Sequence, residues 1–466
     1  MNDARMGLSW QQVNKCGGET VYFSATQLDG SGSRGVTQLS KIRWLGNLAG
    51  ARPLGRAHMS ALALLGGKKA KSKPFPVWPQ YDENESRALK AVLESRVWWR
   101  TPGTKTLEFE RAFAKFHSAR HGIAVTNGTA ALEVTMAGLG IGPGNEVILP
   151  DFTFVATASA VLFANALPVL VDVDPDTYCI DPDLVEAAIT PRTKAIIAVH
   201  MGGHPADLDR LQQIAETRGL ALIEDSSHAH ASEWRGKRIG SFGAAGTFSF
   251  QSSKLMTAGE GGIVISNDDK FEVQARSVHD CGRMPGEWFY SHFIYGSNYR
   301  LSEWQGAILH AQLSRLDEQT KRRHQNARLL DQLLRQIPGI TPQKLDERCT
   351  RNGQYAYIFH FNKQDFAGIS TERFTAAMNA EGIPNQASYP PLHELHMFKN
   401  GEYRKRLLDQ QAKEDHAFLR ERFAVTQKAA WETVWIPQPA LLGDEDDMHE
   451  IAGALGKIQK SAKDLA

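Results

Sequence analysis

A lysine and an aspartate that could act together on a carbonyl compound stand in the middle of the chain. Lys254 follows the apolar stretch 247–250 and lies among small and apolar residues without an adjacent acid. Such surroundings suit an amine whose pKa must be lowered before it can attack a carbonyl carbon. A single lysine is more often a solvated surface residue. The interpretation of Lys254 as a reactive amine therefore depends on other residues near it.

Asp225 gives the first support. It closes the apolar run 220–224, at the end of an expected strand where ligands of parallel sheets bind. A buried carboxylate in this place needs a cationic partner to stay ionised. A protonated pyridine nitrogen would be such a partner, and the ion pair would make the ring a better electron sink. A helix N-cap and a magnesium ligand are the alternative interpretations of this aspartate.

A third motif, Asn127-Gly128-Thr129, stands where a strand ends and a helix begins. Free N–H groups and the positive end of a helix favour binding of an anion, and a phosphate group is the anion that such sites commonly bind. Simple capping of the helix by Thr129 explains the motif equally well. Ser249, on the strand before Lys254, could add a hydroxyl group. Phosphate site, acid and lysine in this order are far more specific than any one of them.

The elements that must position these residues alternate between short apolar strands and helical segments. This alternation predicts an α/β fold with a mostly parallel central sheet flanked by helices. Strands are expected at 123–126, 146–149, 167–171, 195–199, 220–224, 247–250 and 262–266. Helices are expected at 83–95, 105–118, 130–139, 157–165, 182–188, 207–218 and 302–336. A smaller C-terminal α+β domain would follow, with a strand at 355–361 and a helix at 371–381.

The length of the chain allows two domains. We expect a large catalytic domain at 59–320 and a small C-terminal domain at 321–466. Residues 1–58 are interpreted as a disordered extension, because Gly and Ser are frequent and periodicity is weak. No acidic residue stands between Asp29 and Asp82, and a basic, acid-poor start is also typical of a transit peptide.

Charge and cysteine content narrow the class of protein. A net charge of +1 gives no electrostatic reason to expect nucleic acid or a membrane surface as a partner. No apolar run approaches the roughly 20 residues of a membrane-spanning helix. Cys16, Cys179, Cys281 and Cys349 form no CxxC pair, so we expect no zinc or other metal site and no disulfide framework. The expected location is the cytoplasm.

The motifs resemble those of the sugar and cyclitol aminotransferases of the DegT/StrS type, which are pyridoxal-phosphate (PLP) enzymes of fold type I. The resemblance extends over residues 75–400 and is most diagnostic around the lysine, in TFSFQSSKLMTAGEGG (247–262). It implies the fold of type I and PLP as cofactor. The other matching segments are TNGTAALE (126–133), PDFTFVATASA (150–160), VDVDPDTYCID (171–181), EDSSHAHAS (224–232) and GSNYRLSEWQGA (296–307).

The resemblance also implies a role for each residue near the cofactor. Lys254 would be the Schiff-base lysine and then the general acid and base of the proton shift, and Asp225 would hold the ring nitrogen. Phe152 and Phe154 alternate with polar residues, so one of them could simply be core. The remaining contacts would be Gly128, Thr129 and Ser249 at the phosphate, Phe154 stacked on the ring, and His228 near it.

Asn298 resembles the family residue that reaches the cofactor phosphate of the partner subunit. This implies a homodimer whose active sites are shared between two chains. The residues that contact the acceptor are less well marked, since the aromatic pair at 98–99 could also be interface core and the prolines near 390 could serve a turn. The candidate substrate contacts are Trp98, Trp99, Arg100, Tyr389 and His393.

The resemblance implies transfer of an amino group from glutamate or glutamine to a keto-sugar or keto-cyclitol. Related dehydrating enzymes have histidine in place of Lys254, so the lysine favours transamination. The segment 98–100 resembles members that act on scyllo-inosose, and 3-amino-5-hydroxybenzoate synthase, while a nucleotide-linked acceptor stays open. The alternatives are an aminotransferase–dehydratase that forms an aminated aromatic ring, and a catalytically silent PLP-binding regulatory protein. A nicotinamide oxidoreductase is disfavoured, because TNGTA stands where GxGxxG would open the first βα turn.

Overall fold

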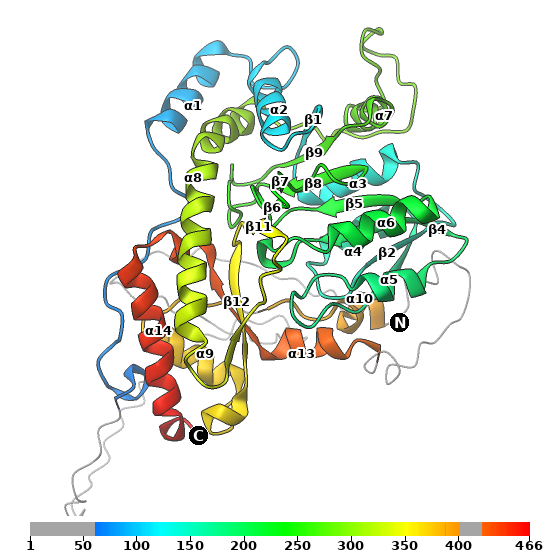
Figure 1. The fold of residues 1–466 in the computed structure, drawn as a ribbon. Helices are drawn as coiled ribbons and strands as arrows, with labels where there is room; N and C mark the ends of the chain where they lie inside the picture. The colour runs from blue at the N-terminus through cyan, green and yellow to red at the C-terminus, as the bar shows by residue number, and fades with distance from the viewer. Residues whose placement is uncertain (1–60, 387, 400–421) are drawn as a thin grey trace, which may run out of the picture. The chain divides into compact units, whose positions relative to one another are not determined.

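The computed structural model of the chain describes residues 61–386, 388–399 and 422–466 (Figure 1). Contacts divide the chain into two units, residues 1–57 and 58–466, and all of the described residues belong to the second. The extension predicted at 1–58 lies outside the described residues. Among the residues described, no helix is both long and apolar enough to span a membrane.

A seven-stranded sheet in the order β1-β9-β8-β5-β4-β2-β3 forms the centre of the larger part. The five strands from β8 to β3 are parallel to one another, whereas β9 is antiparallel to both of its neighbours. The connection from β8 to β9 carries Lys254 and contains no helix, so the chain returns antiparallel. The prediction of a mostly parallel sheet is confirmed. Its strands are β1 (His121–Val125), β2 (Glu146–Pro150), β3 (Leu167–Val171), β4 (Thr193–Val199), β5 (Ala221–Asp225), β8 (Ala245–Ser249) and β9 (Gly262–Ser266).

Helices pack against strands of the sheet and against one another. α3 contacts β8, β9, α4 and α7, whereas α6 contacts β4, β5 and α5 (Figure 1). α1 begins at a capping box in which Asp82 and Glu85 bond each other's backbone N–H groups. The helices are α1 (Glu83–Ser95), α2 (Lys105–Phe116), α3 (Gly128–Gly138), α4 (Ala156–Phe163), α5 (Pro182–Ala188), α6 (Leu208–Arg218) and α7 (Asp269–His279).

The long helix α8 (Glu303–Leu334) connects this sheet with a smaller antiparallel sheet, β10-β12-β13. A second apolar core forms around the smaller sheet and includes Ala327, Leu330 and Leu334 of α8. The predicted domain boundary at 320/321 falls inside α8, and the division into two domains stays a prediction. The other elements are β10 (Ile340–Pro342), β12 (Ala356–Phe361), α9 (Thr371–Ala380), α10 (His396–Lys399), α13 (Ala424–Glu432), β13 (Thr433–Pro437) and α14 (Glu445–Lys460).

A third sheet, β11-β6-β7, was not expected from the sequence. Its strands are only two or three residues long, which is too short for alternation to be recognised. They are β6 (Glu233–Trp234), β7 (Lys237–Arg238) and β11 (Cys349–Arg351). The pairing of β6 with β11 joins the segment after β5 to the segment before β12. It therefore connects the part of the chain that contains the seven-stranded sheet with the part that contains the β10-β12-β13 sheet.

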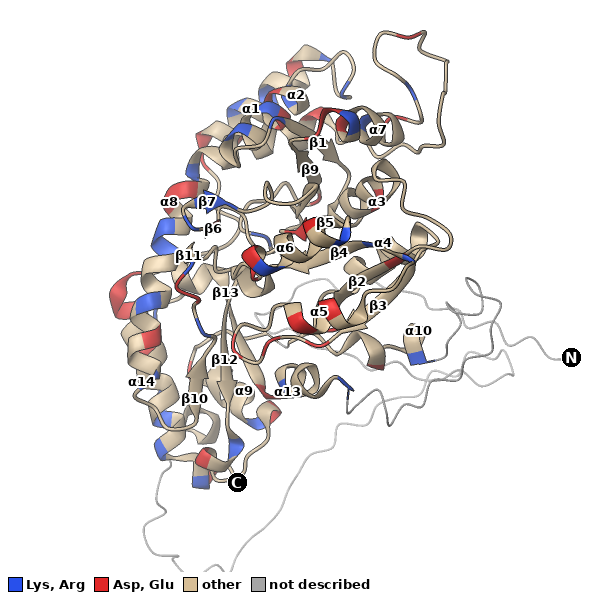
Figure 2. Cartoon of the chain, turned by 45° about the vertical axis from the view of Figure 1, so that its right-hand side comes forward, with Lys and Arg blue, Asp and Glu red and all other residues tan. Residues whose placement is uncertain are grey.

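Basic residues of the acid-poor stretch bind the C-terminal helix. Figure 2 shows that α14 contains both basic and acidic residues. Lys71 is buried and donates from Nζ to Asp447 and, over 2.7 Å, to Glu450 Oε2. Lys73 Nζ lies 2.8 Å from Asp444 Oδ2 on the surface. Part of the basic segment that resembled a targeting sequence therefore holds the fold together.

Three buried histidines should make the stability of the protein dependent on pH. Burial lowers the pKa of His117 to about 3, and those of His204 and His279 to about 4. The unfolded chain, with histidine pKa values near about 6.5, then binds more protons than the folded chain as the pH falls. We expect the free energy of unfolding to be highest above pH ~6.5 and to fall toward pH ~4, by up to ~1.4 kcal/mol per pH unit for each histidine.

Denaturant unfolding between pH 8 and 5 tests this expectation. His117→Phe should reduce the pH dependence, and His449→Asn, a change at an exposed histidine, is the matched control. A stability that is independent of pH over this range, or equal slopes for His117→Phe and the wild type, would contradict the account.

Candidate active site

A cavity of about 640 Å³ opens at the carboxyl ends of the parallel strands. Its wall includes Gly128 after β1, Asp225 at the end of β5 and Ser249 at the end of β8. This is the edge at which ligands of parallel sheets bind. Of the residues predicted from the sequence, eight line this one cavity, namely Gly128, Thr129, Phe154, Asp225, His228, Ser249, Lys254 and Tyr389.

Lys254 is buried at the wall of this cavity, with 9% of its surface exposed. Its Nζ lies 4.5 Å from the centre of the Tyr355 ring. Burial lowers the pKa of Lys254 to about 8, and attraction to the Asp225 carboxylate acts in the opposite direction. A useful fraction of the amine is therefore neutral near neutral pH, as attack on a carbonyl requires.

The Asp225 carboxylate is fixed by two hydrogen bonds. Oδ2 accepts from the hydroxyl of Thr157 over 2.9 Å, and Oδ1 accepts from the N–H of Ser227 over 3.2 Å. Asp225 does not cap a helix, since β5 ends at this residue and α6 precedes the strand. The position and the donors suit a carboxylate that pairs with a cationic ring nitrogen.

The turn between β1 and α3 has the form of a phosphate site. The helix is capped by Asn127, whose side chain accepts from the N–H of Ala130 over 2.8 Å. Thr129 is therefore not the N-cap, and the alternative interpretation of this motif was wrong. A Cβ added to Gly128 would lie 2.7 Å from the Cβ of Ser249, so only glycine leaves the space between helix and strand open. N–H groups at a helix start, an open turn and the nearby Ser249 hydroxyl together suit a phosphate group.

His228 is held by two tyrosines. Its ring stacks on Tyr355, with 4.1 Å between the ring centres and 13° between the planes. Its Nε2 lies 3.0 Å from the hydroxyl of Tyr389. Nδ1 is buried and has no hydrogen-bond partner among the described residues. Burial and the charge of Lys254 hold the pKa of His228 well below its usual value, so the ring is neutral.

Phe152 and Phe154 separate into a core residue and a cavity residue. Phe152 is completely buried, whereas Phe154 is 53% exposed and lines the cavity, 5.7 Å from the Tyr389 ring. Phe154 is therefore the aromatic residue that could lie against a ring bound in the cavity. Its stacking role stays a prediction.

Several predicted residues lie away from this cavity. Arg100 forms an ion pair of 2.8 Å with the fully buried Glu110. Both ring nitrogens of His393 are bonded within the protein, Nδ1 to Asp151 over 2.6 Å and Nε2 to Gln427 over 3.0 Å. These bonds explain Arg100 and His393 without any substrate.

The other three lie on the surface of the chain. Trp98 packs against Trp304 with 5.5 Å between the ring centres, and Trp99 lies 6.4 Å from Phe289. Both are about half exposed, and Asn298 is exposed as well. Trp98, Trp99 and Asn298 are therefore absent from the lining of the cavity within a single chain.

Glu133, Tyr299, Tyr355 and Thr157 are among the polar cavity residues that sequence reasoning missed. Glu133 accepts a hydrogen bond of 2.9 Å from Tyr299, and burial raises the pKa of Tyr299 to about 12. Tyr355 stands at the start of a predicted strand, and Thr157 at the start of a predicted helix. A signal was available for Glu133, Thr157 and Tyr299, because they fall in the matching segments 126–133, 150–160 and 296–307.

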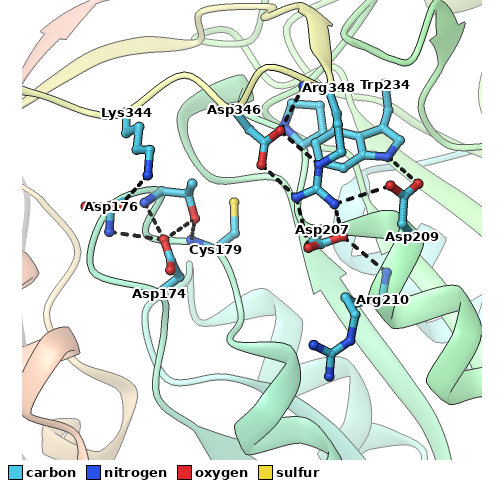
Figure 3. Close-up of polar contacts among 12 residues, drawn as sticks. Asp174, Asp176, Cys179, Asp207, Asp209, Arg210, Trp234, Lys344, Asp346 and Arg348 are labelled. Carbon is cyan, nitrogen blue, oxygen red and sulfur yellow. Dashed lines mark hydrogen bonds and ion pairs between the residues drawn. The ribbon is translucent and has the colours of Figure 1, made fainter.

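A second, smaller cavity of about 140 Å³ is lined by charged residues (Figure 3). Arg348 donates to Asp207, Asp209 and Asp346 over 2.7–3.2 Å. These pairs join the segment before β11 to the start of α6, so the cluster is structural. Within the described residues, no three His, Cys, Asp or Glu side chains are placed to hold a metal ion.

Comparison with known proteins identifies the relatives of this site. The DegT/DnrJ/EryC1/StrS aminotransferase family model matches residues 79–455. The chain is 41% identical over 387 residues to 3-amino-5-hydroxybenzoate synthase of Amycolatopsis mediterranei, covering 82% of this chain and 96% of the relative. It is 38% identical over 419 residues to L-glutamine:2-deoxy-scyllo-inosose aminotransferase of Streptoalloteichus tenebrarius, covering 87% and 99%. The crystal structure of 3-amino-5-hydroxybenzoic acid synthase superposes with a TM-score of 0.77 at 39% identity, covering 83% and 99%.

Proposed function

The chain belongs to the DegT/DnrJ/EryC1/StrS aminotransferase family, and from this premise we propose that it transfers an amino group from glutamine to a keto-cyclitol or a related keto-sugar. It is a PLP-dependent aminotransferase. The observation that carries the proposal is the meeting of Lys254, Asp225 and the Gly128 turn at one cavity. The activity of the relative from Streptoalloteichus tenebrarius supports glutamine as donor and a keto-cyclitol as acceptor.

The residues of the cavity have different roles in this reaction. PLP, when bound, supplies an aldehyde that receives the amino group and a ring that holds the electron pair released beside it. The Gly128 turn and Ser249 would bind the phosphate, and Asp225 would keep a proton on the ring nitrogen. Lys254 would remove a proton from one carbon and return it to the neighbouring one through Nζ.

The lining of the cavity supports a free ring as acceptor. Lys254 is the only lysine or arginine among the described residues of the lining, and it is needed for the chemistry. A nucleotide-linked sugar would bring a diphosphate, which is normally bound by several cationic groups. Hydroxyl and amide groups of Ser227, Gln251 and Tyr299 suit the hydroxyls of a cyclitol instead.

The second candidate function is formation of 3-amino-5-hydroxybenzoate. The identity of 41% to the synthase from Amycolatopsis mediterranei favours it. Product analysis separates the two functions. The PLP-loaded enzyme is incubated with glutamine and 2-deoxy-scyllo-inosose, and the products are examined by mass spectrometry and ultraviolet absorbance. An aminated ring that retains its hydroxyl groups supports the proposal, and failure to aminate any keto-cyclitol would contradict it.

We also propose that the enzyme is a homodimer with shared active sites. Asn298 is exposed in the single chain and lies at the end of a segment rich in exposed aromatic side chains. Exposed apolar patches of this kind mark protein interfaces. Trp98 and Trp99 extend the same aromatic surface, since Trp99 faces Phe289. The aromatic members of the segment are Trp288, Phe289, Tyr290, Phe293 and Tyr295.

Mixing two inactive variants tests the shared site. Asn298→Asp would place a negative charge near the phosphate of the partner's site, and Lys254→Ala would remove the reacting amine. If the sites are shared, a mixed dimer of the two variants contains one intact site, and we expect up to about a quarter of wild-type activity after random exchange of subunits. Failure of the mixture to exceed the activity of its components, with exchange verified, would contradict the shared site.

We propose the cytoplasm as the location. Cys179, Cys281 and Cys349 are free thiols, which supports a reducing compartment.

A further inference from the structure

A buried arginine stands on helix α8 where the helix passes from one apolar core to the other. Arg323 is completely buried, and it follows Leu316 of the core around the seven-stranded sheet and precedes Ala327 of the core around the smaller sheet. Burial lowers the pKa of Arg323 to about 9, and no carboxylate among the described residues offsets this effect. Arg323 therefore still carries a positive charge at neutral pH, in the interior of the protein.

The contacts of Arg323 leave most of its guanidinium group unpaired. Nε donates to Oε1 of Gln438 over 2.9 Å, and Cζ lies 5.5 Å from the centre of the Trp78 ring. Nη1 and Nη2 are buried, and neither has a hydrogen-bond partner among the described residues. A buried charge without a counter-ion is strongly unfavourable. The charge of Arg323 therefore requires a negative partner from outside the described side chains.

Two further unpaired groups accompany the guanidinium group. Gln438 is buried, and since its Oε1 accepts from Arg323, its Nε2 is an NH2 group, for which no partner is present in the described parts of the chain. Thr320 lies one turn before Arg323 on the same face of α8, and its buried hydroxyl is unpaired within the same residues. All of these unpaired groups can donate a hydrogen bond, and the three nitrogens can only donate. Such a set suits an anion.

A water molecule would satisfy this set less well. The unpaired Nδ1 of His230 is an acceptor, because Nε2 lies 2.9 Å from the carbonyl oxygen of Ser249 and must donate to it. Burial holds the pKa of His230 well below its usual value, and the charge of Arg323 adds to this effect. Water between Arg323 and His230 could complete hydrogen bonds, but it carries no charge and would leave the guanidinium group uncompensated.

We propose that the guanidinium group of Arg323 and the amide NH2 group of Gln438, with the hydroxyl of Thr320 as a further donor, bind a small monovalent anion such as chloride. A single uncompensated positive charge requires one negative charge, and the complete burial of Arg323 favours a small ion. The anion joins α8 to the segment that follows β13, between the two cores. This site is separate from the cavity of Lys254, whose lining contains none of the three residues.

Bromide, which can replace chloride and is detected by its anomalous scattering, tests the site directly. Crystals of the PLP-loaded enzyme are soaked in sodium bromide, and data are collected at the bromine absorption edge. We expect an anomalous peak within hydrogen-bonding distance of Nη1 or Nη2 of Arg323 and of Nε2 of Gln438. Water without an anomalous peak at this place would overturn the proposal, and this result requires no variant to fold.

The stability of the PLP-loaded enzyme should also depend on chloride. In denaturant unfolding at constant ionic strength, with chloride replaced by gluconate, we expect the equilibrium constant of unfolding to fall about tenfold for each tenfold rise in chloride above its dissociation constant. Gln438→Glu supplies a carboxylate beside Arg323. This variant should be insensitive to chloride and more stable than the wild type in gluconate. Arg328→Met, which removes an exposed arginine of the same helix, is the matched control and should keep the chloride dependence.

A wild-type stability that is the same in chloride and gluconate would overturn the proposal, as would an unchanged chloride dependence in Gln438→Glu. Loss of the chloride dependence in Arg328→Met would overturn the assignment to Arg323. None of these measurements needs turnover. The anion site can therefore be refuted while amino transfer is demonstrated, and it can be confirmed in an enzyme whose acceptor is different from the proposed one.

Discussion

Replacement of Lys254 by alanine is expected to lower kcat for amino transfer by about 10⁴-fold or more. The buried Nζ of Lys254, with its pKa lowered to about 8, is the group in the cavity that can both attack the cofactor aldehyde and carry a proton between neighbouring carbons. Alanine removes both capacities. The Gly128 turn and Asp225 remain, so the variant should still bind PLP noncovalently. Steady-state kinetics and equilibrium dialysis with PLP measure the two properties.

Two further variants show whether the loss is specific. Lys254→Arg keeps a positive charge but cannot supply a neutral amine, and it should be as inactive as Lys254→Ala. Lys270→Ala removes an exposed lysine of α7 and should leave the activity unchanged. More than about one hundredth of wild-type kcat in Lys254→Ala would exclude Lys254 as the reacting amine, because loss of proton transfer alone should cost more.

Asp225→Asn is expected to have the second-largest effect, a loss of about 10²–10³-fold in kcat together with weaker binding of PLP. Asparagine has nearly the same shape, its oxygen can accept from the Ser227 N–H and its NH2 group can donate to the Thr157 hydroxyl, but it has no charge to hold a proton on the ring nitrogen. The change therefore tests the charge of Asp225 more than its packing. Steady-state kinetics at saturating PLP separate the lower rate from the weaker binding.

Thr157→Val is the matched control for Asp225→Asn. It removes the hydroxyl that donates to Oδ2 of Asp225 over 2.9 Å and leaves the carboxylate in place. A loss of about tenfold is expected, at the lower end of the range for one hydrogen bond to a charged group. The account would be contradicted if Asp225→Asn had a kcat within threefold of the wild type, or if Thr157→Val were the more damaging change.

Most of the fold could be predicted because its elements are marked locally. The helix at 83–95 and the strands at 167–171 and 262–266 have the predicted bounds in the structure. Apolar periodicity and turn residues within each segment were enough to define them. The meeting of Asp225 with Lys254 was also predictable, since the carboxyl ends of parallel strands share one edge of the sheet.

Contacts between distant segments could not be predicted in this way. Tyr355 precedes β12 but covers Lys254, about a hundred residues earlier in the chain, and nothing in its own segment indicates this. Arg100 and His393 have residue types that suit a substrate site, yet each is bound by a buried carboxylate, Glu110 or Asp151. Only the folded chain brings these acids to them.

The central claim, that this cavity exchanges an amino group through PLP bound at Lys254, is tested most directly by one absorbance measurement. The purified protein is loaded with PLP, freed of excess cofactor, and its spectrum is recorded before and after addition of glutamine without an acceptor. We predict a visible band of the lysine-bound cofactor that is replaced by the near-ultraviolet band of the amine form, and no such change in Lys254→Ala. A wild-type protein that takes up no PLP, or whose spectrum stays the same with excess glutamine and glutamate, would contradict the claim.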